Sequence, residues 1–362
     1  MTPGFFSAIR LVMQVSSSQG KRFLVTGGAG FIGSQFVEMA VQRGHTVLVL
    51  DALTYAGHRE NLEGIQGPGS FELVVGNICD FQLTQKLLHD HCIDAVVHFA
   101  AESHVDRSIS GPAAFIETNI QGTFQLLGSS LEYWKNLSGT KKENFRYLQI
   151  STDEVFGSLG PTGKFSETTP YAPNSPYSAS KASGDHLVRA WHHTFGLPTL
   201  ITNCSNNYGP RQFPEKLIPT MITHALNQKP LPIYGDGGNI RDWIHVSDHC
   251  LGVFLALELG IPGSTYCLGG NAEKNNLEVV KTLCTELDRL HPRSDHKPHA
   301  TGIQFVTDRL GHDRRYAIDD TLAQKELGFK RKYDFETGLA ETVQWYLNHP
   351  QWCKAVLQRK IK

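Results

Sequence analysis

Residues 23–33 of this chain, Phe-Leu-Val-Thr-Gly-Gly-Ala-Gly-Phe-Ile-Gly, decide its fold. An apolar run ends in glycines spaced G-x-x-G-x-x-G, and residues 31–43 then carry apolar side chains at helical spacing. A strand, a glycine turn and a helix in this order allow a pyrophosphate to lie against the backbone at the positive end of a helix dipole. The stretch therefore predicts a dinucleotide-binding βαβ unit.

Further apolar runs have the length and composition of buried strands. They lie at residues 46–50, 73–75, 95–97 and 147–150, and the intervals between them leave room for crossover helices. Strands that alternate with helical patterns are typical of parallel sheets covered by helices. We therefore expect an α/β fold, a doubly wound parallel Rossmann sheet with a smaller C-terminal substrate-binding lobe.

The predicted organisation of the chain has three parts. Residues 1–20 form a flexible N-terminal extension, and residues 21–205 form the dinucleotide-binding domain with the catalytic residues. Residues 206–362 form mainly the substrate-binding lobe, interleaved with late Rossmann elements. Prolines gather in segments that we interpret as loops over the site and as the start of the lobe, at Pro170, Pro173, Pro176, Pro214, Pro219, Pro230 and Pro232.

Composition argues against several classes of function. The 362 residues are 40% hydrophobic and 19% charged, with a formal net charge of −1, so bulk charge favours neither a nucleic-acid nor an acidic-membrane partner.

The apolar run at residues 5–13 is interrupted by Arg10 and is too short to span a membrane. We interpret it as a disordered tail, or as sequence before a true start at Met13, in preference to a targeting segment.

Cysteine and histidine usage predicts neither disulfides nor a metal site. None of the seven cysteines forms a C-x-x-C pair, which favours a reducing, cytoplasmic location. The seventeen histidines form local clusters, but none stands with carboxylates or cysteines at a recognised ligand spacing. We therefore expect no bound metal.

Asp51 follows the second predicted strand and indicates which cofactor binds. A carboxylate at this position can accept hydrogen bonds from the ribose hydroxyls of adenosine, and it would repel a 2′-phosphate. Residues 52–57, Ala-Leu-Thr-Tyr-Ala-Gly, contain no arginine that could hold such a phosphate. NAD is therefore predicted in preference to NADP. The alternative is a glycine turn that serves helix packing alone, beside a surface aspartate.

Tyr177 and Lys181 stand one helical turn apart and can face the same direction. A free tyrosine has a pKa of about 10, too high for a base at neutral pH, and a nearby ammonium would lower it by stabilising the phenolate. The pair suits hydride chemistry at an alcohol. Two solvated side chains on an unrelated helix would show the same spacing, but the preceding nucleotide-binding half favours the catalytic interpretation.

Thr152, Asp153 and Glu154 directly follow the predicted strand at 147–150. The carboxyl ends of parallel strands line the ligand crevice in sheets of this kind. Thr152 would form a hydrogen bond with a substrate hydroxyl, and the two carboxyl groups offer a separate acid and base. Oxidation combined with such a pair predicts oxidation followed by elimination. The alternative is an acidic pair that merely begins a helix or turn.

Nearly the whole chain, from about residue 21, resembles the extended short-chain dehydrogenase/reductase superfamily and, within it, the dTDP-glucose 4,6-dehydratase family. The matching segments are Thr26-Gly-Gly-Ala-Gly-Phe-Ile-Gly-Ser34, Leu53-Thr-Tyr-Ala-Gly57, Ala100-Ala-Glu-Ser-His-Val-Asp-Arg-Ser108, Ser151-Thr-Asp-Glu154, Ser175-Pro-Tyr-Ser-Ala-Ser-Lys181, Asn203-Cys-Ser-Asn-Asn-Tyr-Gly-Pro210, Phe213-Pro-Glu-Lys-Leu-Ile-Pro219, Arg241-Asp-Trp243 and Gly311-His-Asp-Arg-Arg-Tyr316. The Thr-Asp-Glu triplet together with Tyr-x-x-x-Lys distinguishes this family from sugar-nucleotide epimerases, which lack the acid pair.

The resemblance implies an NAD-dependent lyase that converts dTDP-glucose to dTDP-4-keto-6-deoxyglucose. Tyr177 would take the proton of the 4-hydroxyl while a hydride passes from carbon 4 to NAD, and the new ketone would acidify the proton on carbon 5. Glu154 would remove that proton, and Asp153 would protonate the departing 6-hydroxyl; the hydride would then return to carbon 6. NAD is regenerated in each turnover, so it should stay tightly bound.

The resemblance also implies which residues hold the two ligands, beside the catalytic set of Thr152, Asp153, Glu154, Tyr177 and Lys181. The residues around NAD would be Gly27, Gly30, Phe31, Ile32, Gly33, Asp51, Thr54, Asn77, Ile78, Ala100, Ala101, Ser103, Tyr177, Lys181 and Asn207. The residues around the sugar nucleotide would be Ser103, Thr118, Thr152, Asn206, Lys216, Leu217, Pro232, Tyr234, Arg241, Asn276, Arg309 and His312. Arg241 and Arg309 suit the diphosphate, because guanidinium can bind phosphate through two hydrogen bonds.

Some positions depart from the family pattern. Asn77 replaces an aspartate beside the adenine, Leu310 replaces a proline, Phe156 replaces a tyrosine and His58 replaces an asparagine. None of these changes falls on a predicted catalytic residue. They make the predicted base of the sugar nucleotide, thymidine in preference to uridine, depend less firmly on the resemblance than the reaction type does. The alternatives are a UDP-glucose 4,6-dehydratase, an epimerase of the same superfamily and a non-catalytic NAD-binding protein.

The family forms dimers by pairing two helices from each subunit, which implies a homodimer. The candidates are the helix around residues 112–134 and the helix that starts near Tyr177. The apolar positions of the first helix could equally belong to the intramolecular core, and they are Phe115, Ile120, Phe124, Leu127 and Leu131.

Overall fold

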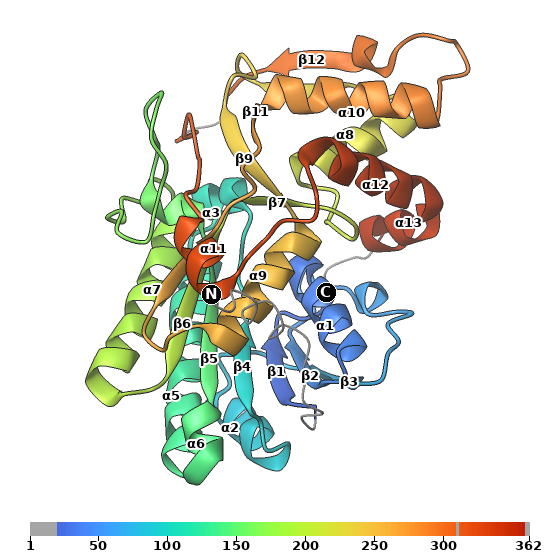
Figure 1. Ribbon diagram of the computed structural model, residues 1–362. Helices are drawn as coiled ribbons and strands as arrows, with labels where there is room; N and C mark the ends of the chain where they lie inside the picture. The colour runs from blue at the N-terminus through green and yellow to red at the C-terminus, as the bar shows by residue number, and fades with distance from the viewer. Residues whose placement is uncertain (1–19, 309–310, 359–362) are drawn as a thin grey trace, which may run out of the picture.

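The computed structural model describes residues 20–308 and 311–358 (Figure 1). These residues form a central sheet flanked by helices, with a smaller lobe beyond one end of the strands. Apart from Gly20, the predicted N-terminal extension lies outside the described residues.

The strands of the main sheet are all parallel, in the order β10-β6-β5-β4-β1-β2-β3. They are β1 (Arg22–Thr26), β2 (Thr46–Asp51), β3 (Ser70–Val75), β4 (Ala95–His98), β5 (Arg146–Thr152), β6 (Thr199–Cys204) and β10 (Thr265–Leu268). The strand order reverses between β1 and β4, and ligands of such sheets bind outside the carboxyl ends of the strands at this point. The predicted parallel sheet is confirmed.

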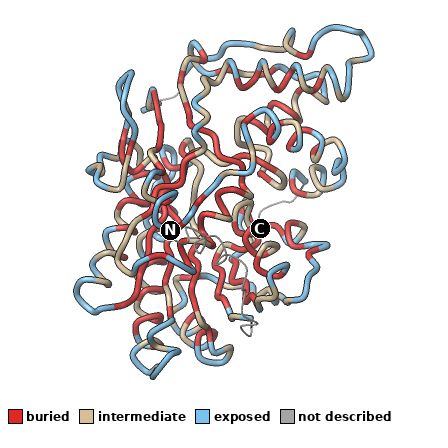
Figure 2. The backbone as a smooth tube through the Cα atoms, viewed as in Figure 1, coloured by how far each residue is buried: buried red, intermediate tan, exposed pale blue. Residues whose placement is uncertain are grey.

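Helices cover both faces of the sheet, because successive side chains of each strand point to opposite sides. Val25 enters the core on one face and Leu24 the core on the other. The helices on the Val25 face are α1 (Phe31–Gln42), α9 (Val246–Leu259) and α11 (Thr321–Leu327). The helices on the Leu24 face are α2 (Phe81–Asp90), α5 (Thr123–Lys135) and α7 (Pro176–Phe195). Figure 2 shows that burial is concentrated along the strands and on the inner sides of these helices.

The smaller lobe has its own core and two short sheets. One sheet has the order β11-β9-β7, and the other pairs β12 with β8. The lobe elements are β7 (Asn206–Tyr208), α8 (Leu217–Leu226), β8 (Leu231–Tyr234), β9 (Ile240–His245), β11 (Glu273–Asn275), α10 (Asn276–Leu290), β12 (Ile303–Val306), α12 (Phe335–Asn348) and α13 (Pro350–Gln358). Three of the prolines predicted in loops lie in regular elements: Pro176 is the first residue of α7, Pro219 is in the first turn of α8 and Pro232 is in β8. These positions tolerate proline, because a first helical turn and an edge strand need fewer backbone N–H donors.

A π-helical segment interrupts the helix predicted around residues 112–134. Short α4 (Ala113–Phe115) leads into η2 (Ile116–Gly122), which continues as α5. Such π turns often occur at functional sites, because the extra residue rotates nearby side chains. The remaining short helices are η1 (Arg59–Asn61), α3 (Val105–Ser110), α6 (Gly139–Asn144), η3 (Asp153–Phe156) and η4 (His299–Gly302).

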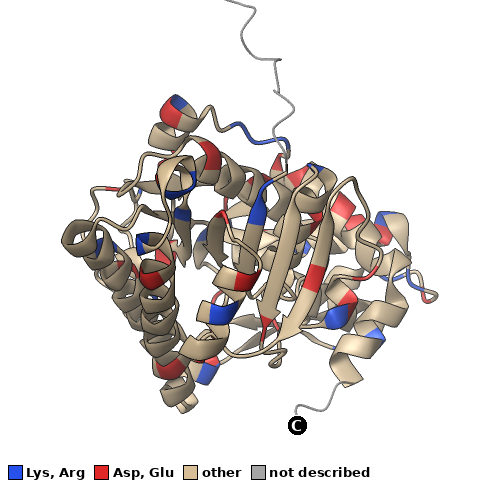
Figure 3. Ribbon diagram, turned by 90° about the horizontal axis from the view of Figure 1, so that it is seen from below, with Lys and Arg blue, Asp and Glu red and all other residues tan. Residues whose placement is uncertain are grey.

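The surface of the described residues carries both signs of charge. Basic and acidic residues are interspersed along the ribbon in Figure 3, in keeping with the formal net charge of −1. None of the helices in the described part of the chain has the length and apolar character needed to cross a membrane. All seven cysteines are free thiols.

Candidate active site

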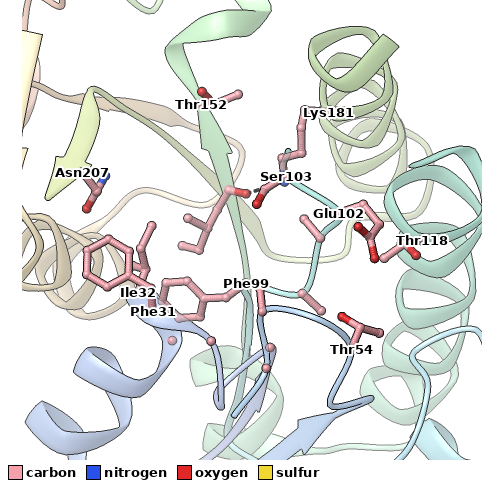
Figure 4. Close-up of a pocket in the computed structure, with 18 of the residues that line it drawn as sticks. Phe31, Ile32, Thr54, Phe99, Glu102, Ser103, Thr118, Thr152, Lys181 and Asn207 are labelled. Carbon is pink, nitrogen blue, oxygen red and sulfur yellow. Dashed lines mark hydrogen bonds between the residues drawn. The ribbon is translucent and has the colours of Figure 1, made fainter. Parts of the chain in front are cut away.

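A cavity of about 330 Å³ opens at the carboxyl ends of the central strands, a size typical of small-molecule sites (Figure 4). In Figure 4, Lys181 and Thr152 lie on one side of this cavity, and Phe31 and Ile32 of the glycine turn lie across from them. The predicted site residues that line it are Gly27, Gly30, Phe31, Ile32, Gly33, Asp51, Thr54, Asn77, Ile78, Ala100, Ala101, Ser103, Thr118, Thr152, Asp153, Glu154, Tyr177, Lys181, Asn206, Asn207 and Lys216. All the residues predicted for NAD and for catalysis are therefore brought together.

The glycine turn between β1 and α1 has the shape that a dinucleotide requires. Gly27 has a φ of +70°, and a Cβ there would lie 2.6 Å from the backbone nitrogen of Ala100. A Cβ at Gly33 would lie 2.2 Å from the carbonyl oxygen of Gly27. The close packing keeps the start of α1 against the end of β1, with the backbone exposed to the cavity. The turn therefore fits the pyrophosphate of NAD.

Gly33→Ala is expected to weaken NAD binding at least tenfold and to lower the melting temperature. The new methyl group meets backbone atoms that cannot rotate away, and overpacking of this kind costs about 1–3 kcal/mol. NAD content after gel filtration and the melting temperature measure the two effects. Gly160→Ala is the matched control, because a Cβ at Gly160 meets no atom within 4 Å. Wild-type NAD content in the Gly33→Ala protein would contradict the assignment of this turn.

Asp51 is the last residue of β2 and is held rigidly at the edge of the cavity. Its Oδ2 accepts a hydrogen bond from the Ala29 amide at 2.9 Å, and its Oδ1 accepts one from the Leu53 amide at 2.7 Å. A carboxylate oxygen can accept more than one hydrogen bond, so ribose hydroxyls can still bind to it. The position suits the ribose contact predicted from the sequence, and the negative charge disfavours a 2′-phosphate there.

Tyr177 and Lys181 lie in the first two turns of α7, which Ser175 caps through the amide of Ser178. Both side chains are buried and line the cavity. The Lys181 ammonium donates a hydrogen bond of 2.7 Å to the carbonyl oxygen of Ile150, and Asp185 follows one turn further along the helix. α7 thus fixes the pair against the end of β5.

The expected effect of Lys181 on the tyrosine is not what the structure shows. The pKa of Tyr177 lies well above its usual value, first because the side chain is buried and then because Glu154 is near. Burial also lowers the pKa of Lys181. For these protein groups alone the pKa of Tyr177 is therefore raised and not lowered as predicted, because burial disfavours the charged phenolate.

Asp153 and Glu154 begin η3 directly after β5, so they are both the start of a short helix and part of the cavity wall. Asp153 is buried, and its Oδ1 accepts a hydrogen bond of 3.3 Å from Thr152. Its Oδ2 has no hydrogen-bond partner among the described residues. Burial, reinforced by Glu154, raises the pKa of Asp153 well above its usual value. Asp153 is therefore suited to hold a proton that Oδ2 can donate to a bound ligand.

The predicted sugar-nucleotide residues fall into two groups. Ser103, Thr118, Thr152, Asn206 and Lys216 line the cavity, and Thr118 comes from the π segment. Arg309 lies outside the described residues. The others are in the lobe and do not line this cavity, and they are Leu217, Pro232, Tyr234, Arg241, Asn276 and His312.

Arg241 is buried in β9, where its guanidinium donates to the carbonyl oxygens of Ile240 at 2.8 Å and Asp313 at 2.9 Å. Nδ1 of His312 lies within hydrogen-bond distance of Oδ1 of Asp308, at 2.6 Å, and its ring centre lies 6.4 Å from that of Tyr234. In this arrangement Arg241 contacts backbone carbonyls and does not line the cavity, and its predicted partner on the diphosphate lies outside the described residues.

Sequence reasoning missed several residues of the cavity wall. The cavity is also lined by Glu102, Phe213 and Glu215. Each of them lies inside one of the segments that resemble the dehydratase family, and this resemblance is the signal that could have identified them. Asn119 of the π segment was also missed. Its side chain bonds both the amide and the carbonyl of Glu102, at 2.9 and 3.0 Å. This contact fixes the strand-end loop after β4 against η2. The residues of the described chain contain no cluster of metal-ligating side chains.

Comparison with known proteins gives consistent matches over most of the chain. A family model described as GDP-mannose 4,6 dehydratase matches residues 24–342. A dTDP-glucose 4,6-dehydratase of Xanthomonas campestris pv. campestris (strain B100) is 58% identical over 335 residues, which cover 92% of this chain and 95% of the relative.

Solved structures of similar proteins carry a dinucleotide. The dTDP-glucose 4,6-dehydratase of Bacillus anthracis, solved in complex with NAD, is 44% identical with a TM-score of 0.82, covering 93% of this chain and 100% of that one. The dTDP-glucose 4,6-dehydratase of Streptomyces venezuelae, solved with NAD and TYD bound, is 44% identical with a TM-score of 0.83, covering 92% and 99%.

Proposed function

This chain belongs to the dTDP-glucose 4,6-dehydratase family, and we propose that Tyr177, Asp153 and Glu154 carry the family reaction in it. The protein is an NAD-dependent hydro-lyase that converts dTDP-glucose to dTDP-4-keto-6-deoxyglucose. The reaction oxidises carbon 4, eliminates water across carbons 5 and 6, and returns the hydride to carbon 6. The observation that supports the residue assignment is the meeting of the dinucleotide turn, the Tyr–Lys pair and the two carboxyl groups at one cavity.

NAD, held along the Gly27–Gly33 turn and by Asp51, accepts and later donates the hydride when bound, and its cationic ring favours the phenolate of Tyr177. Tyr177 then takes the proton from the 4-hydroxyl of the sugar. Lys181 adds positive charge on the same helix face, and Thr152 can orient the sugar hydroxyl. The high pKa that burial gives to Tyr177 makes its phenolate a strong base once these charges are in place.

The elimination step uses the carboxyl pair. Glu154 is half-buried and removes the proton from carbon 5, which the 4-ketone has acidified. Burial raises the pKa of Asp153, which favours its protonated form, and Asp153 donates that proton to the departing 6-hydroxyl. Two neighbouring carboxyl groups with different environments thereby serve as separate acid and base.

Turnover of dTDP-glucose and of UDP-glucose by the purified protein tests this function. We expect the 4-keto-6-deoxy product from dTDP-glucose without added NAD, detected by its alkaline absorbance and its loss of 18 mass units as water. The ratio of the two rates measures the preference for thymidine. Interconversion of UDP sugars without loss of water would instead indicate an epimerase, and NAD binding without turnover of either substrate would indicate a binding protein.

We further propose a cytoplasmic homodimer. Leu127 and Leu131 belong to the intramolecular core, whereas Phe124 and Ile116 on the same helix are 41% and 50% exposed. Such exposed side chains suit a helix-pairing interface. Seven free thiols suit a reducing compartment. Sedimentation of the holoenzyme tests the dimer.

The domain division at residues 205 and 206 also remains a proposal. β6 ends at Cys204 and β7 of the lobe begins at Asn206, which supports a boundary there. β10, from the later segment, nevertheless completes the main sheet beside β6. The two parts therefore share elements and should unfold together.

A further inference from the structure

We propose that Tyr55, Arg107 and Glu215 form a clasp across the mouth of the NAD groove, and that this clasp retains NAD between turnovers. The proposal rests on the function proposed above, because the clasp closes over the cofactor site of the same cavity. The three residues come from three chain segments that leave different strands, so their contacts depend on tertiary structure.

The sheet topology places the first contact above the dinucleotide turn. Tyr55 lies in the segment after β2, and Arg107 lies in α3, after β4. β1 runs between β2 and β4 in the sheet and ends in the glycine turn. The guanidinium carbon of Arg107 nevertheless lies 3.8 Å from the centre of the Tyr55 ring. The segments that follow β2 and β4 therefore meet, and both line the cavity beside this contact, the first through Thr54 and Ala56 and the second through Ser103.

Glu215 adds the third segment, between β7 of the lobe and α8. Its Oε2 lies 3.4 Å from Nη2 of Arg107 and 3.7 Å from Nε2 of His104. The ring of Phe213, two residues earlier, lies 6.1 Å from the Tyr55 ring in an edge-to-face arrangement. This segment thus contacts both sides of the groove, and both Phe213 and Glu215 line the cavity.

A backbone contact supports the same closure. Nζ of Lys216 donates a hydrogen bond of 3.0 Å to the carbonyl oxygen of Ser103, which ties the lobe segment to the loop after β4. Ser103 also lines the cavity. The lobe therefore closes the NAD groove at two adjacent points, through one ion pair and one hydrogen bond.

The exposure of the clasp explains how it can both retain and admit NAD. The Arg107 side chain is 46% exposed and that of Glu215 is 12% exposed, so the pair faces solvent on one side only. Tyr55 is buried and Oε2 of Glu215 is a buried atom, so Arg107 is the partner that reaches solvent, and the clasp opens when Arg107 moves outward. One ion pair and one cation–π contact are each weak enough for this movement to occur. A closed clasp suits an enzyme that regenerates its cofactor within each turnover, because loss of reduced cofactor would strand the oxidised sugar.

Release of NAD from the purified holoenzyme tests the clasp. The protein is diluted into NAD-free buffer containing an enzyme that consumes free NAD, and the NAD remaining on the protein is followed with time. Arg107→Met removes both contacts and should speed release about tenfold, and Glu215→Gln removes one and should speed it about threefold. Arg43→Met is the matched control, because Arg43 lies 4.4 Å from the Phe254 ring in a contact away from the cavity.

The Tyr55 ring is tested separately from its hydroxyl. Tyr55→Leu should speed release about threefold, because it removes the cation–π contact, whereas Tyr55→Phe should release NAD at the wild-type rate. Addition of excess NAD should restore dehydration in the faster-releasing variants.

Two results would overturn the clasp. The first is an Arg107→Met protein that keeps NAD as long as wild type. The second is faster release from Arg107→Met with no change from Glu215→Gln, which would mean that Arg107 holds a phosphate directly. A wild-type protein that neither carries NAD nor dehydrates dTDP-glucose would instead contradict the proposed function itself.

Discussion

Tyr177→Phe is expected to lower kcat for dehydration about 1000-fold while NAD remains bound to the protein. The proposed mechanism assigns removal of the 4-hydroxyl proton to the phenolic oxygen, and phenylalanine leaves the ring in place without it. The ring packs with Val105 and Phe115, so the fold should survive the change. Initial rates of 4-keto-6-deoxy product at saturating dTDP-glucose measure the effect, and NAD content after gel filtration measures cofactor binding.

A buried tyrosine outside the cavity provides the control for Tyr177→Phe. Tyr147 lies in β5 with its hydroxyl buried and without a hydrogen-bond partner in the described chain. Tyr147→Phe removes the same atom from a buried ring and should leave kcat within about twofold of wild type. If Tyr177→Phe also stays within tenfold of wild type, another group must act as the base.

Asp153→Asn and Glu154→Gln should each lower kcat about 100-fold to 1000-fold, but they should block different bonds. Both substitutions keep the size of the side chain and remove its acid–base chemistry. Without Glu154 the proton on carbon 5 stays in place. Without Asp153 that proton can still leave and return, whereas the 6-hydroxyl departs slowly because it is not protonated.

Deuterium exchange distinguishes the two roles. Wild-type and variant proteins are incubated with dTDP-glucose in deuterium oxide, and the recovered substrate is analysed by mass. Asp153→Asn should return dTDP-glucose with deuterium at carbon 5, and Glu154→Gln should return it unlabelled. The reverse pattern would exchange the two assignments, and full dehydration by either variant would remove that residue from the mechanism.

The raised pKa of Asp153 also predicts how rate and stability depend on pH. The acid role proposed for Asp153 requires its protonated form, so the wild-type rate should fall as the pH rises through that pKa. Its pKa is higher in the folded protein than in the unfolded chain, so folding binds a proton there. The contribution of Asp153 to the free energy of unfolding therefore falls as the pH rises from the pKa of this carboxyl in the unfolded chain towards its higher pKa in the folded protein. Asp153→Asn removes this dependence and should be at least as stable as wild type at neutral pH, which separates lost chemistry from lost structure.

Much of the cofactor site could be predicted from the sequence because it depends on short segments. The G-x-x-G-x-x-G turn, Asp51 at the end of the next strand and Thr152 at the end of β5 all have the places that strand and helix periodicity indicated. Tyr177 and Lys181 share a face because residues four apart on a helix always do. These features require only local backbone geometry.

Other features were predicted wrongly or missed because they depend on how distant segments pack. The pKa of Tyr177 is raised rather than lowered, since the number of protein atoms around a side chain sets its desolvation. Pro176, Pro219 and Pro232 lie in regular elements rather than loops, at positions whose hydrogen bonding tolerates them. Glu215 and Arg107 meet although 108 residues separate them, a pairing that no sequence periodicity encodes.

The sequence by itself thus determined the parallel α/β fold, the preference for NAD and the identity of the groups that could act as base and acid. Each follows from residue type and from spacings shorter than one βαβ unit. Only the tertiary structure decided which carboxyl group is buried, so that its protonated form is favoured, and which distant segments meet beside the cavity. Burial and contacts between distant segments arise when the lobe and the sheet pack together, and the free energy of a buried charge is a property of that packing.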